Sequence, residues 1–300
     1  MILLDFSQIV ISNLHAELQG QTDVEINLPL LRHMVINTIR SLKVKFSREY
    51  GSLIIATDSR KYWRKEAFQY YKANRKKARE DSGLDWNEIF KSLDLIKSEI
   101  EAVFPYPVLN IDGAEADDVI ATLVEWTQKN DLNTGMFDEG EPQPVLILSG
   151  DGDFEQLQRH KNVKQYSPIH KKWILAQGTP DEVVMEHILA GDKSDGVPNF
   201  LSADNSFVNG IRQKSLFKAN LELWRTQKVE EFITDPKSEL MKNFKRNQQL
   251  IDLRCIPKAI KKDIIKQYGS KRNVERDRTK ILNYFIQNRM KLLIESTGDF

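Results

Sequence analysis

The sequence predicts an α/β protein with a largely parallel central sheet, helices on both faces and a smaller all-helical C-terminal region. Two observations lead to this class. Short apolar runs alternate with helical patterns up to about residue 180, and strands that alternate with helices pair in parallel through right-handed crossovers. After residue 180 the strand signals fade, and we expect an α/β core over residues 1–180 and a helical domain over residues 181–300.

The predicted strands are four short apolar runs, each of a length and composition typical of buried strands. They are Ile2–Leu4, Leu53–Ala56, Val108–Ile111 and Val145–Leu148. Apolar residues between Ile89 and Val103 recur at spacings of three and four, behind a capping-box pattern at Asp85 and Glu88, and so predict an amphipathic helix. Later helical patterns span 180–189, 215–232, 238–253 and 277–296, and residues 130–144 are expected to form an exposed loop.

The composition excludes several classes of protein. The 300 residues are 40% apolar, enough for a large core, and 44 basic against 43 acidic residues give a net charge of +1 that neither favours nor disfavours a nucleic-acid partner. A single cysteine, Cys255, rules out a disulfide framework, and five scattered histidines leave no zinc pattern, so any metal is expected to be held by oxygen. Neither a leader nor an apolar run of membrane length is evident, which predicts a soluble intracellular protein without a membrane partner.

Carboxylates follow the predicted strands. In open parallel sheets, ligands bind beyond the carboxyl ends of the strands, so we expect these acids to converge on one crevice. Three runs are followed within three residues by an acid, a Glu-Ala-Asp-Asp run follows another strand, and a last pair lies in a Gly-Asp-Lys-Ser-Asp-Gly loop. The acids are Asp5, Asp58, Glu115, Asp117, Asp118, Asp151, Asp153, Asp192 and Asp195.

Each acid alone has an ordinary structural explanation, such as a helix cap or a turn. Together, carboxylates crowded at one edge repel one another and raise their pKa values unless cations neutralise them. Oxygen ligands suit Mg²⁺ or Mn²⁺, and the pattern predicts phosphodiester hydrolysis at two ions about 3.5–4 Å apart. Dinucleotide, P-loop and nucleophile-elbow motifs are missing from the sequence, and Ser7 occupies the place where a haloacid-dehalogenase-type phosphatase needs a second Asp.

Positive charge is concentrated between Arg60 and Glu80, where nine Lys or Arg and two acids are interleaved with aromatic residues. If this segment is one helix, Arg64, Phe68, Lys72, Arg75 and Arg79 lie on one face, which could bind phosphates and stack bases of a single strand. The alternative is a solvated helix whose aromatic residues pack on the sheet.

These motifs, in order, resemble those of the 5′-nuclease (flap endonuclease) family. The similarity is strongest to T-even bacteriophage RNase H enzymes and extends more distantly to the 5′-nuclease domains of bacterial DNA polymerases. It rests on Leu3-Leu4-Asp5, the 62–75 segment, Glu115-Ala-Asp117-Asp118, the 149–154 and 163–168 segments, and Gly191-Asp192-Lys-Ser-Asp195. It covers essentially the whole chain.

The resemblance implies a Mg²⁺-dependent 5′→3′ exonuclease and flap endonuclease that cuts RNA–DNA hybrids and DNA and removes RNA primers during phage DNA replication. Its implied metal ligands, for two Mg²⁺ that Mn²⁺ can replace, are Asp5, Asp58, Glu115, Asp117, Asp151, Asp153 and Asp195, with Asp118 and Asp192 as outer or second-metal candidates. Asp151 and Asp153 are expected to be catalytic.

The resemblance also implies a basic helical arch at about 60–84. Arg64 and Lys72 are expected to meet the scissile phosphate, and Tyr71, Arg75, Lys76, Lys77 and Arg79 to bind the nucleic acid. Implied partners are RNA–DNA hybrid, flap or forked DNA, a sliding clamp and a single-strand-binding protein. We expect a monomer in the cytoplasm of an infected bacterium.

One departure concerns the C-terminal domain, which the resemblance expects to bind duplex DNA. Relatives follow the Gly-Asp-x-x-Asp loop with a Gly-x-Gly hairpin, whereas this chain continues with residues 197–206, without that glycine pair. The role of this region therefore stays open. Two rival interpretations are a non-catalytic nucleic-acid-binding relative and a PIN-type ribonuclease, although the latter would have neither the basic segment nor the large helical region.

Overall fold

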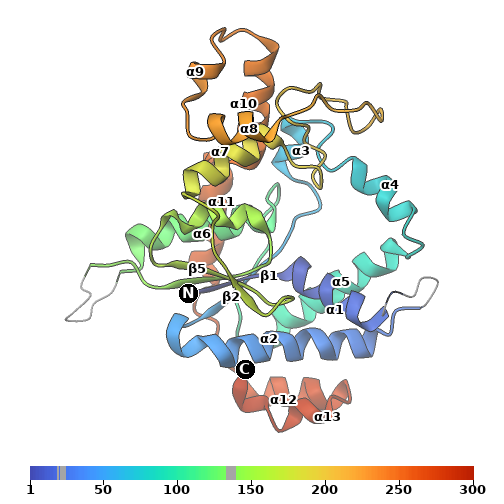
Figure 1. Ribbon diagram of the computed structural model, residues 1–300. Helices are drawn as coiled ribbons and strands as arrows, with labels where there is room; N and C mark the ends of the chain where they lie inside the picture. Colours follow the sequence, from blue (N-terminus) through green and yellow to red (C-terminus); the bar gives the residue numbers. More distant parts are fainter. Residues whose placement is uncertain (19, 21–24, 133–139) are drawn as a thin grey trace.

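The computed structural model describes residues 1–18, 20, 25–132 and 140–300, and it is built around a six-stranded sheet of order β3-β2-β1-β4-β5-β6 (Figure 1). Neighbouring strands from β3 to β5 are parallel, and β6 is antiparallel to β5. The strands are β1 (Ile2–Asp5), β2 (Leu53–Ala56), β3 (Val108–Leu109), β4 (Val145–Leu148), β5 (Val163–Ser167) and β6 (Lys172–Ile174). The predicted α/β class with a largely parallel sheet is confirmed.

The register brings the ends of the strands to one edge. Ile2 lies opposite both Leu53 and Leu146, and Asp5 lies opposite Ala56, so the chain leaves β1, β2 and β4 at the same carboxyl edge. All four predicted strands are present, with β3 shorter than expected. Strands β5 and β6 were not predicted, because their sequence alternates too little between apolar and polar residues and β6 is an exposed edge strand.

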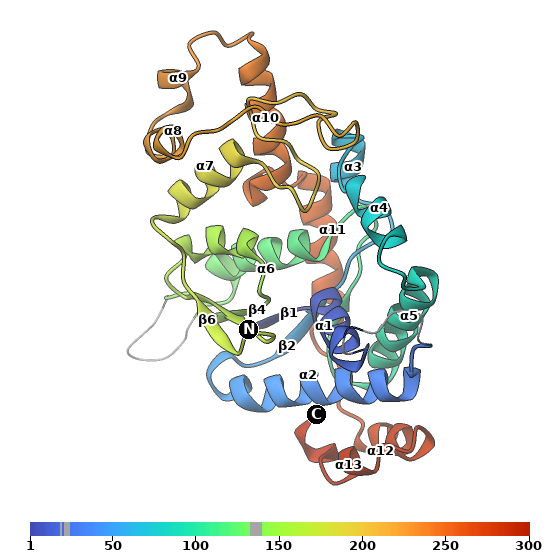
Figure 2. The ribbon, with the colours of Figure 1, turned by 45° about the vertical axis from the view of Figure 1, so that its right-hand side comes forward.

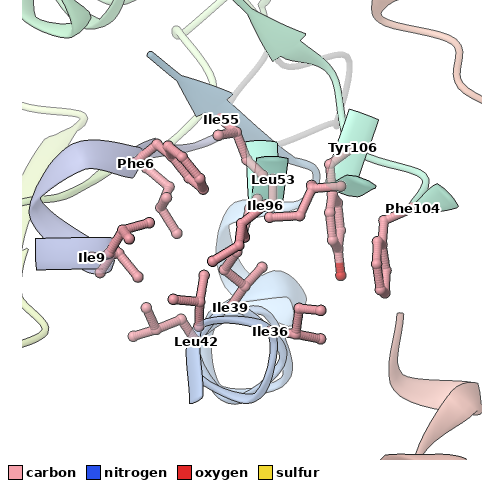
Figure 3. Close-up of a cluster of buried hydrophobic side chains, with 14 of the residues drawn as sticks. Phe6, Ile9, Ile36, Ile39, Leu42, Leu53, Ile55, Ile96, Phe104 and Tyr106 are labelled. Carbon is pink, nitrogen blue, oxygen red and sulfur yellow. The ribbon is translucent and has the colours of Figure 1, made fainter. Parts of the chain in front are cut away.

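One face of the sheet is covered by α1 (Phe6–Leu18), α2 (Leu28–Tyr50) and α5 (Trp86–Val103). Figure 3 shows Ile55 of the sheet packed with Phe6, Ile39 and Ile96 from these helices. The predicted helix is α5, and the Asp85 carboxylate caps it by accepting from the backbone N–H groups of residues 87 and 88. Helices α12 (Arg278–Gln287) and α13 (Lys291–Ile294) extend this core beyond α2.

The opposite face is covered by α6 (Ala116–Asn130) and α11 (Lys258–Lys271). Successive residues of a strand point to opposite faces, so Leu3 and Ile54 meet Ile120 and Ile264 here, while Ile55 faces the other layer. Both faces of the sheet are therefore buried, and its carboxyl edge is the part that can hold a functional site.

A third core joins the basic segment to the C-terminal helices. It contains Phe68 and Tyr71 from the segment, Ile188 from α7 (Pro180–Ala190), Phe200, and Phe244 from α10 (Glu239–Ile251). The 215–232 pattern forms two shorter helices, α8 (Lys218–Trp224) and α9 (Val229–Phe232). Predicted helices at 180–189 and 238–253 are confirmed, whereas the 277–296 pattern is interrupted between α12 and α13, where Arg289 has a φ of 55°.

The basic segment is helical in two parts, so the condition of one continuous helix, on which the shared basic face depended, is not met. The segment forms α3 (Trp63–Ala67) and α4 (Asn74–Glu80), joined by a turn, and Lys72 in that turn has a φ of 56° (Figure 2). Arg64, Lys72 and Arg75 therefore do not share one helical face. The chain breaks here because Phe68 and Tyr71 are buried in the third core instead of presenting their rings to solvent.

Part of the loop expected at 130–144 lies outside the described residues. Within the described part of the chain, no helix combines the length and apolar character needed to cross a membrane.

Candidate active site

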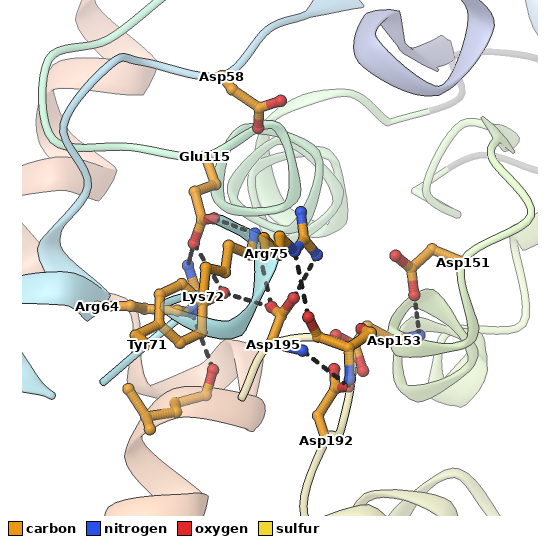
Figure 4. A network of polar contacts seen from close by, with 12 residues as sticks. Asp58, Arg64, Tyr71, Lys72, Arg75, Glu115, Asp151, Asp153, Asp192 and Asp195 are labelled. Atoms are coloured by element: carbon orange, nitrogen blue, oxygen red, sulfur yellow. Dashed lines mark hydrogen bonds and ion pairs between the residues drawn. The ribbon is translucent and has the colours of Figure 1, made fainter. Parts of the chain in front are cut away.

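The acids singled out in the sequence gather along the carboxyl edge of the sheet and the loop after α7. Asp5 ends β1, Asp58 follows β2, Glu115 and Asp117 begin α6, and Asp151 follows β4. Asp153 lies in the 3₁₀ helix η1 (Gly152–Arg159), and Asp192 and Asp195 follow α7. Figure 4 shows most of these side chains around the residues of the basic segment.

We call Asp5, Asp58, Asp117 and Asp151 the sheet half of the site. Its side chains are oriented by neutral donors: Asp5 accepts from the backbone N–H of Gln8 and the Ser149 hydroxyl, both at 3.2 Å. Asp58 accepts from the Ser7 hydroxyl at 2.6 Å and, at its other oxygen, from the backbone N–H of the first residue of α6 at 2.9 Å. None of the ion pairs within the described ranges involves these four acids.

Negative charge in the sheet half is poorly compensated. Burial, followed by repulsion from Asp58, raises the pKa of Asp5 to about 7. Burial and the neighbouring Asp153 raise the pKa of Asp151 to about 6. Burial and the charges of Asp151 and Asp5 hold the pKa of Asp117 well above its usual range. These are the shifts that a divalent cation would reverse.

We call Glu115 and Asp195 the arch half, and here the protein supplies the positive charge (Figure 4). The Lys72 ammonium lies 2.5 Å from a Glu115 carboxylate oxygen and 3.5 Å from an Asp195 oxygen. Arg75 pairs with Asp195, and the Tyr71 hydroxyl lies 2.6 Å from Asp195 and 3.1 Å from Glu115. Burial alone would raise the pKa of Asp195, but Lys72 and Arg75 outweigh it and hold that pKa below its usual value.

Arg64 and Asp118 lie inside the protein rather than at the site surface. Arg64 is 2% exposed; its guanidinium lies 2.8 Å from Asp118 and 2.9 Å from Glu115, and its Nε donates to the Leu250 carbonyl of α10 at 2.8 Å. Asp118 is fully buried and also accepts from the Trp63 indole at 3.1 Å. The sequence placed Arg64 at the substrate and Asp118 near a metal, and in this conformation neither side chain is available for those contacts.

Tyr71 is likewise not placed as expected. Its ring was expected to contact nucleic acid, but only 3% of the residue is exposed and the ring packs in the third core. Lys76 and Lys77 of α4 are exposed, and Arg79 lies over the rings of Trp86 and Phe90. Among the basic-segment residues that were expected to bind nucleic acid, those of α4 are therefore the most open to a strand.

His187, in the last turn of α7, was missed in the sequence. Its Nδ1 lies 2.9 Å from an Asp153 oxygen. Burial would lower the pKa of His187, but Asp153 and Asp192 raise it to about 9, so the imidazole is protonated at neutral pH. A histidine four residues before the Gly191-Asp192 turn is the only sequence signal, and the carboxylate it contacts is 34 positions away.

The donor set fits a hard divalent cation: it consists of carboxylate oxygens, with raised pKa values in the sheet half. Among the residues that the structure describes, however, no three His, Cys, Asp or Glu side chains are grouped closely enough to enclose an ion. Glu115, Asp195 and Asp153 are instead directed toward Lys72, Arg75 and His187. The acids lie along one edge of the sheet, but in this conformation they do not form a preformed metal-binding site.

The sheet order and the acids at its carboxyl edge are consistent with a 5′-nuclease, and the family models assign the chain to this class. Residues 1–187 match the family model for the 5′-3′ exonuclease N-terminal resolvase-like domain, and residues 178–300 match the model for the T4 RNase H C-terminal region. The chain belongs to the 5′-3′ exonuclease and flap endonuclease family, as a homologue of T4 RNase H.

Sequence relatives agree with this assignment. Ribonuclease H of Enterobacteria phage T4 is 36% identical over 99% of this chain and 95% of its own length. DNA polymerase I of Bacillus caldotenax is 25% identical over 69% of this chain, which corresponds to 22% of the polymerase. The likeness to the polymerase is thus confined to a part of that protein.

Solved structures share the fold. The T5 5′-exonuclease with bound zinc ions has a TM-score of 0.61 at 17% identity, covering 92% of this chain and 99% of its own. The bacteriophage T5 flap endonuclease in a pseudo-enzyme-product complex with DNA and metal ions has a TM-score of 0.60 at 18% identity, covering 89% and 98%. Both similarities establish the fold, and those relatives bind divalent metal ions.

Proposed function

We propose that this protein is a Mg²⁺-dependent 5′→3′ exonuclease and flap endonuclease that removes RNA primers from lagging-strand fragments during phage DNA replication. The observation that supports it most directly is the uncompensated charge of Asp5, Asp117 and Asp151 at the carboxyl edge of the sheet. Carboxylates in this state favour a divalent cation, and the family to which the chain belongs hydrolyses phosphodiesters.

In this proposal the metal ligands are the sheet half together with Glu115, Asp153, Asp192 and Asp195. Two Mg²⁺ ions, or Mn²⁺ in their place, would supply a water of lowered pKa and stabilise the leaving oxygen. Asp151 and Asp153 have the most direct catalytic role. Ser7, Gln8 and Ser149 orient the ligands by the hydrogen bonds described above, so that the carboxylates need not reorganise during the reaction.

The basic segment divides into two roles. Lys72, whose ammonium already lies in the site, is proposed to stabilise the scissile phosphate. Arg75, Lys76, Lys77 and Arg79 would bind the strand farther from the reacting bond. Arg64, Asp118 and Tyr71 are proposed to position the site from inside the protein, which replaces the substrate and metal contacts expected from the sequence.

Substrates and partners follow from the same proposal. We infer RNA–DNA hybrid and flap or forked DNA as substrates, duplex binding by residues 181–300, and contact with a sliding clamp and a single-strand-binding protein. The protein is proposed to act as a monomer in the cytoplasm of an infected bacterium.

Cleavage assays test the proposal. Single-turnover reactions with Mg²⁺ would compare a 5′-flap DNA, an RNA-primed DNA duplex and a linear single-stranded RNA. We expect cleavage of the first two from the 5′ end and loss of both in Asp151→Asn. Preference for the linear RNA would indicate the PIN-type alternative, and binding without cleavage would indicate a non-catalytic relative.

A further inference from the structure

The residues that connect α3 and α4 are docked on the loop that follows α7. We call residues 70–75 the arch base. The backbone N–H of Lys72 donates to the Asp195 carbonyl at 2.7 Å, Asn74 Nδ2 donates to the residue-193 carbonyl at 2.8 Å, and Arg75 Nε donates to the residue-194 carbonyl at 3.2 Å. At Gly196, with a φ of 71°, an added Cβ would lie 3.1 Å from the Tyr70 carbonyl oxygen. The two segments therefore fit closely along their backbones.

This docking directs the arch-base cations onto two acids of the site. The positive φ of Lys72, unusual for a residue with a side chain, places its ammonium between Glu115 and Asp195, with only 14% of the side chain exposed. Arg75 approaches the second Asp195 oxygen, and the Tyr71 hydroxyl lies between the two carboxylates. A left-handed backbone conformation raises the free energy of a residue with a side chain, and the contacts around Lys72 keep it in that conformation.

The carboxylate oxygens of Glu115 and Asp195 cannot bind a metal ion and keep their full contacts with Lys72 and Arg75 at the same time. A buried carboxylate requires a positive partner, and a divalent ion binds carboxylate oxygens in place of other donors. In the arch half that partner is supplied by Lys72 and Arg75, whereas the sheet half has no ion pair within the described ranges. Metal and arch base thus require the same two acids, Glu115 and Asp195.

We propose that Lys72 and Arg75 are internal competitors of the divalent metal, which hold the arch base on the 192–196 loop until a metal ion takes Glu115 and Asp195. Metal binding then releases the two cations, which become free to contact substrate phosphate. This inference rests on the proposed function, because it takes Glu115 and Asp195 as metal ligands. Lys72 in this view sets the metal affinity of the nucleic-acid-free protein as well as acting on the substrate.

Metal binding in the absence of nucleic acid tests the competition. Mn²⁺ alone is titrated into the full chain and followed by the electron paramagnetic resonance of the free ion. Lys72→Met, which keeps an apolar chain of similar length, should bind Mn²⁺ about tenfold more tightly than the unmodified protein, since the competitor is removed. Lys76→Met is the matched control: its ammonium is exposed and 3.9 Å from Glu80, away from the site, and its Mn²⁺ affinity should not change.

Hydrogen exchange of the unmodified protein tests the release without a substitution. Amides of the arch base should exchange slowly without metal and about tenfold faster with saturating Mn²⁺, while β1 and β4 stay protected. Tyr71→Phe, which removes only the hydroxyl between the two acids, should speed exchange of the arch base before metal is added.

Unchanged or weaker Mn²⁺ binding by folded Lys72→Met, or an arch base whose exchange does not respond to Mn²⁺, would overturn the inference. Asp151→Asn separates this outcome from failure of the proposed function. If Asp151→Asn loses both Mn²⁺ binding and cleavage while Lys72→Met binds Mn²⁺ as the unmodified protein does, the site is a metal site and only the competition is wrong. If Asp151→Asn cleaves normally, the proposed function itself fails.

Discussion

Glu115 and Asp195 in the arch half of the site each lie within 3.5 Å of a cationic side chain, whereas Asp5, Asp117 and Asp151 in the sheet half form no ion pair within the described ranges. The pKa values follow this difference: that of Asp195 is lowered, and those of the three sheet-half acids are raised. The site therefore contains acids whose negative charge is balanced by cationic side chains and acids whose negative charge is available to a bound cation. The comparison separates two acids that hold the arch base in the metal-free protein from three acids that have no cationic partner among the described residues.

The largest effect should come from the sheet half. Asp151→Asn should lower single-turnover cleavage by more than about 10³-fold, and Asp153→Asn should abolish it similarly, because a metal ligand is lost. Without metal, Asp151→Asn should not destabilise the fold, since it removes a repelled charge. Urea unfolding in a chelator measures this. Asp181→Asn, on the exposed side of α7, is the control for both measurements. Substantial Mg²⁺-dependent cleavage by the Asp151 and Asp153 variants would refute the site.

Substitution of Arg64 should, in contrast, reduce the stability of the fold. Its guanidinium is the buried partner of both Glu115 and Asp118, so Arg64→Met would leave two carboxylates without it. Breaking a buried pair by removing one partner costs about 3–5 kcal/mol, and we expect a loss of unfolding free energy of this order. Chemical denaturation measures it, with Arg60→Met as the control, because the pair that Arg60 forms with Asp94 is exposed to solvent and contributes little to stability. A fully stable Arg64→Met that only cleaves slowly would return Arg64 to the catalytic group.

Lys72 and Arg79 should fail differently, although both belong to the basic segment. Lys72→Ala should lower the saturated single-turnover rate on the order of 10²–10³-fold with little loss of substrate affinity, because its ammonium is proposed to stabilise the charge that develops on the scissile phosphate. Arg79→Ala should weaken binding and flatten the salt dependence by about one phosphate, with an almost unchanged saturated rate. Cleavage of a flap substrate at several salt concentrations measures both. Identical kinetic signatures would contradict this division.

A smaller effect should appear in the pH dependence of metal binding. The folded pKa values of Asp5 and Asp151, about 7 and about 6, exceed the unfolded value of roughly 3.9. The free energy of unfolding of the metal-free protein should therefore decrease as the pH rises through about 4–7 and these acids ionise. A divalent ion removes this cost and must displace the protons. The Mn²⁺ affinity should therefore fall about tenfold or more from pH 8 to pH 6. The increase in Tm caused by Mg²⁺ should likewise be larger at pH 8 than at pH 5.5. An increase independent of pH would place the metal elsewhere.

The sequence contained enough to predict the sheet half. Asp5, Asp58 and Asp151 follow apolar runs, and the geometry of a parallel sheet brings strand ends together whatever the loops do. Contacts of the arch half could not be derived in this way. The pairing of Lys72 with Glu115 spans 43 positions and depends on one left-handed residue, which helical periodicity does not reveal. For the same reason Arg64 was expected on an exposed face, although the tertiary contacts of α10 bury it.

The position of Asp195 in the chain has a consequence for how such enzymes diversify. The two family models overlap at residues 178–187, mostly in α7, and the loop that contacts the arch base follows that helix. The strand-end acids are thus encoded in the first part of the gene, and Asp192 and Asp195 in the second. Recombination between relatives within α7 would exchange the residues that restrain the arch while leaving the strand-end acids intact. Hybrid genes joined there would inherit the strand-end acids from one parent and, from the other, Asp192 and Asp195 together with the loop that contacts the arch base.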